Sequence, residues 1–590
     1  MFFRTKKSGT RSYLQIVENR WVDGRPKQRV IATLGRLDQL QETGQLDALL
    51  VSGARLAQSV LLLSAHAKGQ VPVITTRRIG PVLIFERLWR ETGCQRVIAQ
   101  LLEGRRYEFD VERAVFLTVL HRLMNPGSDR AADKWKSDYQ IEGCNDLQLH
   151  HLYRAMAWLG EELPEDQQKD KTPFAPRCTK DRIEEDLFAH RRNLFTDLQL
   201  VFFDTTSIYF EGEGGQDIGQ RGFSKDHRPD LYQMVVGAVL DGQGRPICCE
   251  LWPGNTADVT TLIPIVDRLR SRFGVRRVCI VADRGMISKE TIAALEQDER
   301  GWQYILGARM RSQNEVKNDV LSRGGRYRVV HPERVNNDDP SPLKVKEVCV
   351  DKRRYIVCLN DDEARKDAAD REAIVAALRE QLRSGDKSLV GNKGYRRYLG
   401  GGGPDHFQVD EAKIAEDARY DGKWVLRTNT ALDSAEVALQ YKRLWTVEHW
   451  FRSCKSLLQT RPIYHKRDET IRGHVFCSFL ALVLRQELQA RLEERGHKLE
   501  WADVIQDLDR LQRVEVEQDG KRFQLRSEVQ GTCGKVFQSV GVALPPTVQQ
   551  VSPTIPGSDA AHSATPPDRC VKSLSVLKIL HCGVEDESGP

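Results

Sequence analysis

The sequence predicts a mixed α/β protein, and the order of apolar patterns in its middle part supports this prediction. Five stretches are short, apolar and rich in β-branched residues, as buried strands are: 198–204, 232–240, 246–252, 278–283 and 302–306. Two stretches among them have apolar residues at helical spacing: 258–273 and 288–297. The order βββαβαβ begins with antiparallel strands and continues with parallel strands joined by crossover helices. We therefore expect one mixed sheet with helices on both faces.

Two regions with different patterns precede this α/β segment. We assign residues 1–75 to a basic N-terminal β-hairpin region with a turn at Asp23-Gly24. Residues 1–36 hold nine Lys/Arg against two acidic residues, a net charge of +7, which suits a polyanion such as DNA and equally suits a solvated basic hairpin. Residues 76–195 show mostly helical patterns, and we expect a helical, DNA-binding domain there.

The remaining boundaries follow from changes of pattern. Residues 196–310 form the first part of the α/β domain, and residues 311–432 interrupt it with short strands, a charged helix and a Gly-rich stretch. This interruption predicts a β-rich insertion. Residues 433–520 return to helix and form the second part of the domain, beginning with an acidic capping sequence at Asp433. Residues 521–590 are a Pro/Ser-rich C-terminal tail, which we expect to be disordered and without catalysis.

Composition limits the partners, the cellular location and the cysteine chemistry that can be expected of the protein. The net charge of +6 on 590 residues is too small to indicate a partner. The longest strongly apolar run, 476–484, is far shorter than the about 20 residues of a spanning helix, so we expect a cytoplasmic protein with no membrane association. The thirteen cysteines are scattered without Cys-x2-Cys spacing, which predicts reduced core residues rather than disulfides or a zinc site.

Three carboxylates lie in sequence contexts that suit chemistry. Asp204 and Asp283 each end an apolar run, so both are expected at strand ends, where the sheet meets solvent. Glu448 lies in the helix that begins near Asp433. Three acidic groups brought together repel one another, and shared divalent cations would hold them together at neutral pH. The arrangement predicts a magnesium site.

The helix of Glu448 collects several side chains on one face. Tyr441, Glu448 and Lys455 are seven residues apart, so they point in nearly the same direction over about 21 Å. Trp445 and Arg452 lie near the same stripe, which surrounds a metal ligand with groups suited to phosphates and a stacked base. The alternative is an ordinary amphipathic helix, in which Trp445 and Phe451 pack in a core and Glu448 pairs with Arg452 at the surface.

In combination, these residues resemble bacterial insertion-sequence transposases of the DDE type, in the IS-four superfamily, whose signature is Tyr-x2-Arg-x3-Glu-x6-Lys. Tyr441, Glu448 and Lys455 match this spacing, and Asp204 begins an Asp-Thr-Thr sequence as in the family. Further similar stretches are 222–231, 254–258, 282–285 and 461–465. The signature arginine is replaced by Leu444, so either Arg443 or another arginine such as Arg452 supplies its charge.

The resemblance implies a fold and a set of roles. Residues 196–310 and 433–520 would form one ribonuclease-H-like catalytic domain, with the β-rich insertion before its last helix. Asp204, Asp283 and Glu448 would be the catalytic residues and would hold two Mg²⁺ or Mn²⁺ ions, with Asp204 bridging both ions. The DNA-binding residues that it implies are Tyr441, Arg443, Trp445, Arg452 and Lys455. Trp445 would stack on an unpaired base if excision passes through a hairpin intermediate.

The function predicted from this resemblance is DNA transposition. The protein would bind the terminal inverted repeats of its element, cleave the strands and join them to target DNA, acting on double-stranded DNA as a homodimer. One alternative is a ribonuclease-H-like nuclease without strand transfer, because the same carboxylates would serve both reactions. Another is a catalytically silent DNA-binding protein at the element ends. Tyr441, Lys455 and the additional domains favour the transposase.

The remaining polar residues of the central segment have ordinary interpretations. Asp226 and Asp230 lie in a polar loop and are interpreted as turn or salt-bridge residues. Asp258 is interpreted as a helix N-terminal residue. His227 and His465 lie among basic residues and could touch phosphate, but neither has partners at zinc-ligand spacing.

Overall fold

A computed structural model of the chain describes most of residues 1–551. The segments outside the description are 23–24, 51, 53–72, 169–175, 192–199, 276–277, 298–301, 335–338, 385–392, 404–405, 519–520 and 552–590. The chain forms two compact units. Of the described residues, unit one comprises those within 1–75, 515–525 and 548–551, and unit two comprises those within 76–514 and 526–547. The chain passes between them at four points: within β4 (Val73–Arg78), within β16 (Gln512–Gln518), within β17 (Lys521–Arg526) and directly before β18 (Val548–Val551).

Unit one contains a three-stranded antiparallel sheet made of β1 (Phe2–Ser8), β2 (Arg11–Val22) and β3 (Arg25–Arg36). Helix α1 (Leu37–Glu42) follows and contacts β2 and β3. The expected hairpin is therefore present with one more strand, while its turn at Asp23-Gly24 lies outside the described residues. Strands β17 (Lys521–Arg526) and β18 (Val548–Val551) pair with each other in the same unit.

Helices follow the strand β4 in unit two, as the apolar spacing of residues 76–195 predicts. Their bounds are α3 (Gly80–Glu91), α4 (Cys94–Leu102), α5 (Val111–Met124), α6 (Asp129–Trp135), α7 (Leu149–Leu159) and α8 (Thr179–Arg191). Helix α5 is buried along its whole length because α16 (Asp468–Glu494) and α7 pack against it. Gly473 of α16 lies so close to the Met156 carbonyl of α7 that a Cβ atom would be 1.9 Å from its oxygen.

The centre of unit two is a nine-stranded sheet in the order β10-β11-β12-β15-β9-β8-β5-β6-β7. The strands of this sheet that come first in the sequence are β5 (Leu200–Tyr209), β6 (Gln233–Asp241), β7 (Pro246–Pro253), β8 (Cys279–Ala282) and β9 (Gln303–Ala308). Strands β5, β6 and β7 are antiparallel, whereas β8 is parallel to both β5 and β9. The sheet is therefore mixed, as the βββαβαβ pattern predicts, and its order and directions are consistent with the ribonuclease-H-like fold that the resemblance implies.

Alternate residues of these strands enter two separate cores, so helices cover both faces of the sheet. Phe203 of β5 and Ile280 of β8 pack with α9 (Leu262–Phe273) and α10 (Lys289–Leu295) on one face. Phe202 of β5 and Val281 of β8 belong to the other core, which includes α14 (Ser434–Lys442), α15 (Trp445–Arg452) and α16. The period-two alternation of a strand therefore assigns neighbouring residues to opposite helix layers.

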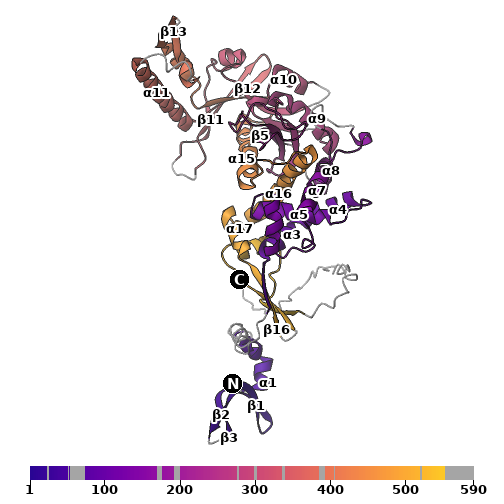
Figure 1. The fold of residues 1–590 in the computed structure, drawn as a ribbon. Coiled ribbons are helices and arrows are strands. Elements are labelled where there is room, and N and C mark those ends of the chain that lie inside the picture. Colours follow the sequence, from indigo (N-terminus) through magenta and orange to yellow (C-terminus); the bar gives the residue numbers. More distant parts are fainter. Residues whose placement is uncertain are drawn as a thin grey trace, which may run out of the picture. The chain divides into compact units, whose positions relative to one another are not determined.

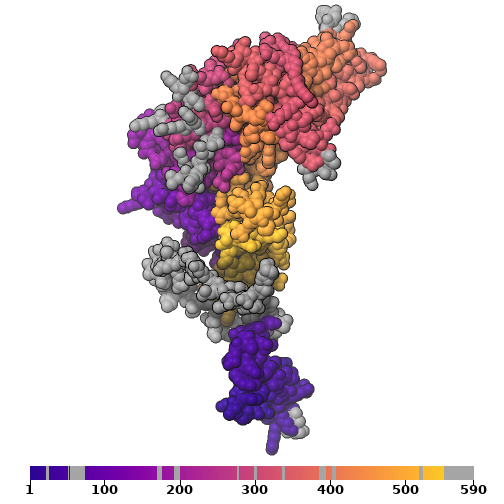
Figure 2. All heavy atoms as spheres, turned by 180° about the vertical axis from the view of Figure 1, so that it is seen from behind, coloured from indigo at the N-terminus to yellow at the C-terminus, as the bar shows by residue number. Residues whose placement is uncertain are grey.

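The insertion expected over residues 311–432 extends the same sheet instead of forming a separate one (Figure 1). Its sheet strands are β10 (Arg328–His331), β11 (Leu343–Val350), β12 (Arg353–Leu359) and β15 (Lys423–Thr428). Strand β15 pairs directly with β9, so the insertion is continuous with the central sheet. The remainder comprises a π turn at Glu315–Val320, α11 (Asp361–Ser384), α12 (Lys393–Arg396), β13 (Leu399–Gly403), β14 (His406–Val409) and α13 (Glu411–Ala418). These residues are the red-to-orange atoms at the top of Figure 2.

The last part of the chain contains more ordered structure than its composition predicts. Helix α17 (Trp501–Asp509) follows α16, and α18 (Cys533–Val540) packs against α16 and α17. Strands β17 and β18 also fall within residues 521–551, which composition assigns to the tail. The Val536 and Phe537 side chains of α18 are buried. Their burial holds this segment against the helices, and the Pro/Ser content of the segment gives no sign of it. The Pro-rich residues 552–590 lie outside the description.

A buried ionic cluster joins α8 to α9 and β7. The Arg272 side chain of α9 is fully buried and forms ion pairs with four carboxylates: Asp181 at 3.4 Å, Glu184 at 2.8 Å, Glu185 at 2.8 Å and Glu250 at 2.9 Å. Lys180 adds a second buried cation, 2.7 Å from Asp181. Buried charges are tolerated only when paired in this way, so the cluster fixes α8 against the α/β domain.

Two further expectations about the chain can be compared with the described residues. The eleven described cysteines are all free, and every one except Cys349 is buried, so most of them are core residues, as predicted. Among the described helices, none is both long and apolar enough to cross a membrane.

Candidate active site

Asp204 and Asp283 lie side by side on neighbouring parallel strands. Phe203 of β5 is opposite Ala282 of β8, so the two aspartates are the next residues in the same register. Asp283 directly follows the last residue of its strand, as predicted. Asp204 does not end its strand, because the β-branched residues that follow it continue pairing with β6 as far as Tyr209. The carboxylates meet where β8 ends and β5 continues.

The surroundings of Asp204 disfavour its negative charge. Burial raises the pKa of the Asp204 carboxyl from 3.8 to about 6, and the nearby Asp283 and Asp258 carboxylates act in the same direction. Lys225 and a 2.7 Å hydrogen bond from the Thr205 backbone N–H oppose this rise without cancelling it. A carboxylate in this position gains from a nearby cation, and carboxylate oxygens are suitable ligands for Mg²⁺. The residues present therefore fit a divalent metal.

Asp258 faces this site, which its interpretation as a helix N-terminal residue does not foresee. It is the first residue of a 3₁₀ turn (Asp258–Thr260) before α9, and its side chain contacts Thr205 and Lys225. Its carboxylate accepts a 2.7 Å hydrogen bond from the Thr205 hydroxyl and forms a 2.9 Å ion pair with Lys225. The Lys225 ammonium also donates to the Thr205 carbonyl at 2.7 Å. Sequence spacing could not reveal this contact, because Lys225 and Asp258 belong to separate loops.

A cavity of about 270 Å³ opens beside this contact. Its lining includes Thr206, Phe223, the cations Lys225 and Arg309, and the acid Asp258. Phe223 is 86% exposed, although its carbonyl is fixed by a 2.9 Å hydrogen bond from the Gln233 side chain. The cavity therefore borders the Lys225–Asp258 contact, and none of Asp204, Asp283 and Glu448 is among its lining residues.

Glu448 lies on a helix that packs against the strand of Asp204. Helix α15 contacts β5 and β6, with Val447 and Phe451 buried beneath it. The Glu448 side chain is exposed. Among the described residues, Asp204, Asp283 and Glu448 do not form a group whose carboxylate oxygens all lie within 4.8 Å of one another. The structure thus pairs the two aspartates and holds Glu448 on the adjacent helix.

The helix of Glu448 is divided into three segments. Asp433 caps the first by accepting a 3.0 Å hydrogen bond from the Ala435 N–H, as its capping sequence predicts. α14 ends at Lys442, α15 begins at Trp445, and a π turn occupies Ser453–Leu457. Residues seven apart therefore do not lie on one straight face. Trp445 is 60% exposed, so its alternative interpretation as a core residue is wrong.

Tyr441 nevertheless reaches the aspartates. Its hydroxyl donates a 3.0 Å hydrogen bond to Asp283 Oδ1. Burial and the adjacent Asp283 raise the pKa of the Tyr441 phenol well above its usual range, so the hydroxyl keeps its proton. The first residue of the signature is thus a direct neighbour of the second aspartate.

Lys455 lies in a separate charge cluster with Asp226. The Lys455 ammonium is 2.8 Å and the Arg461 guanidinium 2.5 Å from the same Asp226 oxygen. Burial lowers the pKa of Lys455, and Asp226 opposes that change. Asp226 is therefore a salt-bridge residue, as predicted, and so is Asp230, which pairs with Arg228 at 2.9 Å.

The arginines near the substituted Leu444 point in different directions. Leu444 itself is buried. Arg443 donates to the carbonyl of Gly242 in the turn between β6 and β7. Arg452 is exposed, and no ion pair between it and Glu448 is present among the described residues. Arg461, which sequence reasoning did not single out, is the arginine beside Lys455.

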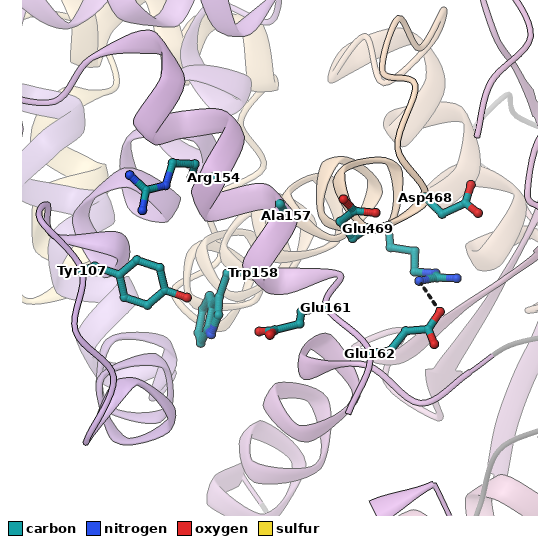
Figure 3. Close-up of a pocket in the computed structure, with 9 residues that line it drawn as sticks. Tyr107, Arg154, Ala157, Trp158, Glu161, Glu162, Asp468 and Glu469 are labelled. Atoms are coloured by element: carbon teal, nitrogen blue, oxygen red, sulfur yellow. Dashed lines mark hydrogen bonds and ion pairs between the residues drawn. The ribbon is translucent and has the colours of Figure 1, made fainter. Parts of the chain in front are cut away.

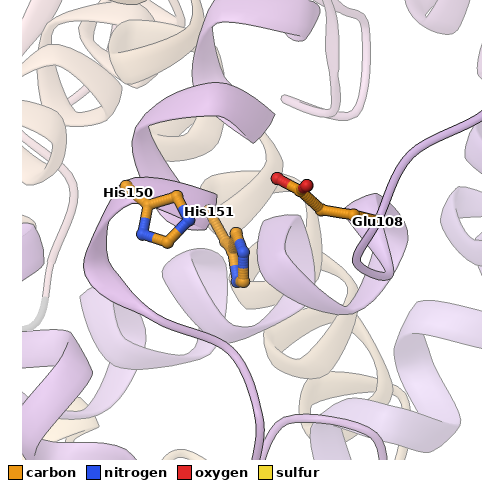
Figure 4. Close-up of side chains that lie close together, drawn as sticks. All are labelled: Glu108, His150 and His151. Carbon is orange, nitrogen blue, oxygen red and sulfur yellow. The ribbon is translucent and has the colours of Figure 1, made fainter.

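Two histidine clusters invite comparison with metal sites. Glu108, His150 and His151 lie close together (Figure 4). However, His151 Nδ1 accepts the Gln148 backbone N–H at 3.1 Å, and Glu108 is paired with Arg154, so neither ligand is free for a metal. Because His151 Nδ1 accepts this hydrogen bond, Nε2 carries the ring proton. To bind zinc through Nε2, the proton would have to move to Nδ1 and this hydrogen bond would be lost.

The second cluster contains His465 together with Asp129 and His474. The Arg122 guanidinium is 2.9 Å from His474 Nδ1, and His474 Nε2 is 3.1 Å from the Thr460 carbonyl. Because arginine always donates, Nδ1 is the acceptor and Nε2 carries the proton. His465 is thus part of a hydrogen-bonded network between α6 and α16.

A larger cavity of about 530 Å³ lies between α7 and the start of α16 (Figure 3). Four of its lining side chains are acidic and two are arginines: Glu161, Glu162, Asp468, Glu469, Arg154 and Arg472. Arg472 is already paired with Glu162 at 3.1 Å. An excess of negative charge does not suit DNA phosphates, so this cavity is a weaker candidate than the aspartate site.

Comparison with known proteins gives two family matches. Residues 196–484 match the family described as transposase DDE domain, and residues 3–64 match the N-terminal domain of IS1634 family transposases. No curated protein matches the chain. A cryo-EM structure of the piggyBac transposase synaptic complex with hairpin DNA shows a weak likeness, with 11% identity, a TM-score of 0.36, and coverage of 72% of this chain and 79% of that one. Both matched models are of transposases, and the chain is a DNA transposase of the DDE class, of the insertion-sequence type.

Proposed function

We propose that this transposase binds the terminal inverted repeats of its own element, cleaves the DNA there and joins the freed ends to target DNA, as members of the IS-four superfamily do. The DDE family implies dependence on a divalent metal. We assign that metal as two Mg²⁺ ions, with Mn²⁺ as a substitute, held by Asp204, Asp283 and Glu448. The observation that carries the proposal is the placement of Asp204 and Asp283 in the same register on adjacent parallel strands.

Each proposed residue has a task that its contacts support. Bound metal would activate the attacking oxygen and stabilise the leaving oxygen at the scissile phosphate. Tyr441 orients the Asp283 carboxylate through its hydroxyl, and burial keeps that hydroxyl protonated. Lys225 offsets the negative charge beside Asp204. Glu448 completes the ligand set from α15, the helix packed against β5.

DNA contacts are proposed for the exposed side of this site. Trp445 is available to stack on an unpaired base because most of its ring is exposed. Arg452 is exposed on the same helix, whereas Lys455 would exchange Asp226 for a DNA phosphate. Arg443 contacts the turn between β6 and β7, so its contribution to DNA binding would require it to leave Gly242.

The proposal also assigns the larger segments. Residues 76–195 would bind DNA beside the catalytic domain formed by residues 196–310 and 433–520, and residues 311–432 would support the DNA from the extended sheet. Cleaving two ends in concert requires two active sites, so we propose that the assembled complex is a homodimer. A nuclease without strand transfer remains the second candidate, and the product distinguishes the two.

The test is cleavage of a labelled duplex that carries the element end, in the presence of Mg²⁺. We compare the wild type with Asp204→Ala, Asp283→Ala and Glu448→Ala at matched DNA occupancy, with Asp230→Ala as the exposed-carboxylate control. We expect a 3′-hydroxyl at the element end from the wild type and the control only. Cleavage by any of the three variants at the wild-type rate would remove that residue from the site. Strand joining to a second duplex would exclude the nuclease.

A further inference from the structure

The ribbon formed by β2 and β3 in unit one carries an unbalanced charge on one face. Arg20 is directly opposite Lys27, Glu18 is opposite Arg29, and Val22 is opposite Arg25. Directly opposed residues of an antiparallel pair share a face, and so do alternate residues of one strand. One face therefore holds four cations and a single acid: Arg20, Arg25, Lys27, Arg29 and Glu18. We call this set the cationic face.

The cationic face is not neutralised within the described part of the ribbon. Glu18 lies 2.7 Å from Arg20 and 3.9 Å from Arg29, and no ion pair of Arg25 or Lys27 is present among the described residues. The Arg20 and Arg29 side chains are 58% and 63% exposed. Because like charges directly opposite each other destabilise a sheet, the Arg20–Lys27 pair disfavours the ribbon in the absence of a partner. An anionic partner would remove this cost.

The dimensions of the ribbon suit the major groove of DNA. Two strands about 4.8 Å apart fit a groove about 12 Å wide, which is known to admit a two-stranded ribbon. Five residues of each strand, 18–22 and 25–29, span about 16 Å at about 3.3 Å per residue. Over the same span the opposite face presents the uncharged pairs Asn19–Gln28 and Trp21–Pro26, and Arg4 of β1 donates a hydrogen bond to Gln28 there. Charge and shape together therefore favour DNA over an apolar partner.

We propose that the cationic face of the β2–β3 ribbon (indigo in Figure 2) binds double-stranded DNA in the major groove, as a contact separate from the aspartate site. Arginine and lysine on this face would contact phosphates and the acceptor atoms of guanine. The inference rests on the proposed function, because the DNA concerned is the end of the element. It adds the surface in unit one that holds that end. A-form RNA is not an alternative substrate, because its major groove is too narrow for side chains.

The test measures binding, not cleavage, in the full chain carrying Asp204→Ala. Fluorescence anisotropy with a duplex of the outermost element sequence gives the slope of log K against log salt. We expect Arg20→Gln combined with Lys27→Gln to make this slope less steep by about 1.8, because each lost phosphate contact changes it by about 0.9. The matched control is Lys6→Gln, which removes one exposed cation that is paired with Tyr13 and lies on the opposite face. Its slope should not change.

Further variants separate lost contacts from lost folding. Exchanging the two cations, as Arg20→Lys with Lys27→Arg, should keep most of the slope if charge on this face binds the DNA. An unchanged slope in the Gln double variant would overturn the proposal, as would an equal loss in Lys6→Gln or equally tight binding of an A-form RNA duplex. If the Gln double variant leaves the salt slope unchanged while Asp204→Ala still abolishes cleavage, only the proposal about the cationic face is wrong. If cleavage survives in Asp204→Ala, the aspartate site is wrong whatever the ribbon does.

Discussion

Replacing Asp204 with Asn should stabilise the protein when no divalent metal is present. Folding raises the pKa of the Asp204 carboxyl from 3.8 to about 6, so its ionisation is harder in the folded state than in the unfolded chain. This difference corresponds to about 3 kcal/mol, and to less where water reaches the partly buried side chain. The wild type loses this stability as pH rises from about 4 to about 6, and the loss is complete above that range.

Asn is a suitable replacement because it removes the charge and keeps the shape. Its side-chain oxygen can still accept the Thr205 N–H. At pH 7.5 with EDTA, we expect thermal unfolding of Asp204→Asn to occur several degrees above the wild type, at about 2–4 °C per kcal/mol. At pH 4 the two proteins should unfold together. Added Mg²⁺ should raise the unfolding temperature of the wild type and leave that of the variant unchanged.

Asp230→Asn is the matched control, since its carboxylate is exposed and paired with Arg228. It should gain no stability in EDTA. Equal unfolding temperatures of the wild type and Asp204→Asn at pH 7.5 would refute the electrostatic account of Asp204. A wild type that does not respond to Mg²⁺ would refute its role as a metal ligand, independently of the first result.

Four further outcomes test other parts of the structure. Chelation by EDTA should stop cleavage while DNA binding persists, as gel shift and product analysis would show together. Asp226→Asn should lower the free energy of unfolding by about 2–3 kcal/mol in urea, because two cations lose their shared carboxylate. Arg272→Met should cost about 3–5 kcal/mol by leaving buried carboxylates unpaired, whereas the exposed Arg383→Met should change stability by less than about 0.5 kcal/mol. Burial opposes ionisation of Asp129, yet His465 and Arg122 lower its pKa from 3.8 to about 2, so Asp129→Asn should be less stable than the wild type at pH 7 and the difference should disappear near pH 2.

The central sheet was predictable because each strand carries its own signal. The runs at 278–283 and 302–306 correspond to β8 and β9 within a few residues, since a short apolar run between helical patterns is typical of a buried strand. The joining of the insertion to this sheet was not predictable. Thr428 pairs with Ile305, and no local property of either segment specifies a partner so distant in the chain.

The candidate site shows the same limit. Sequence context singled out Asp204 and Asp283, and the strand register brings them together. The contacts of Asp258 with Lys225 depend on two loops and left no sequence signal. The Lys455 prediction assumed a regular helix, whereas a π turn at Ser453–Leu457 rotates that residue toward Asp226. Spacing arguments fail wherever the helix itself changes pitch.

The late arrival of β15 in the sheet affects synthesis of the chain. Strand β9 ends at Ala308, and its antiparallel neighbour β15 begins only at Lys423. At about 5–20 residues per second, a ribosome needs about 6–23 s to make the intervening segment. During that interval the outer edge of β9 has no strand of its own to pair with, and unpaired edges invite association between nascent chains. Slower translation of the insertion should therefore lower the yield of soluble protein, while the activity of each correctly folded molecule stays the same.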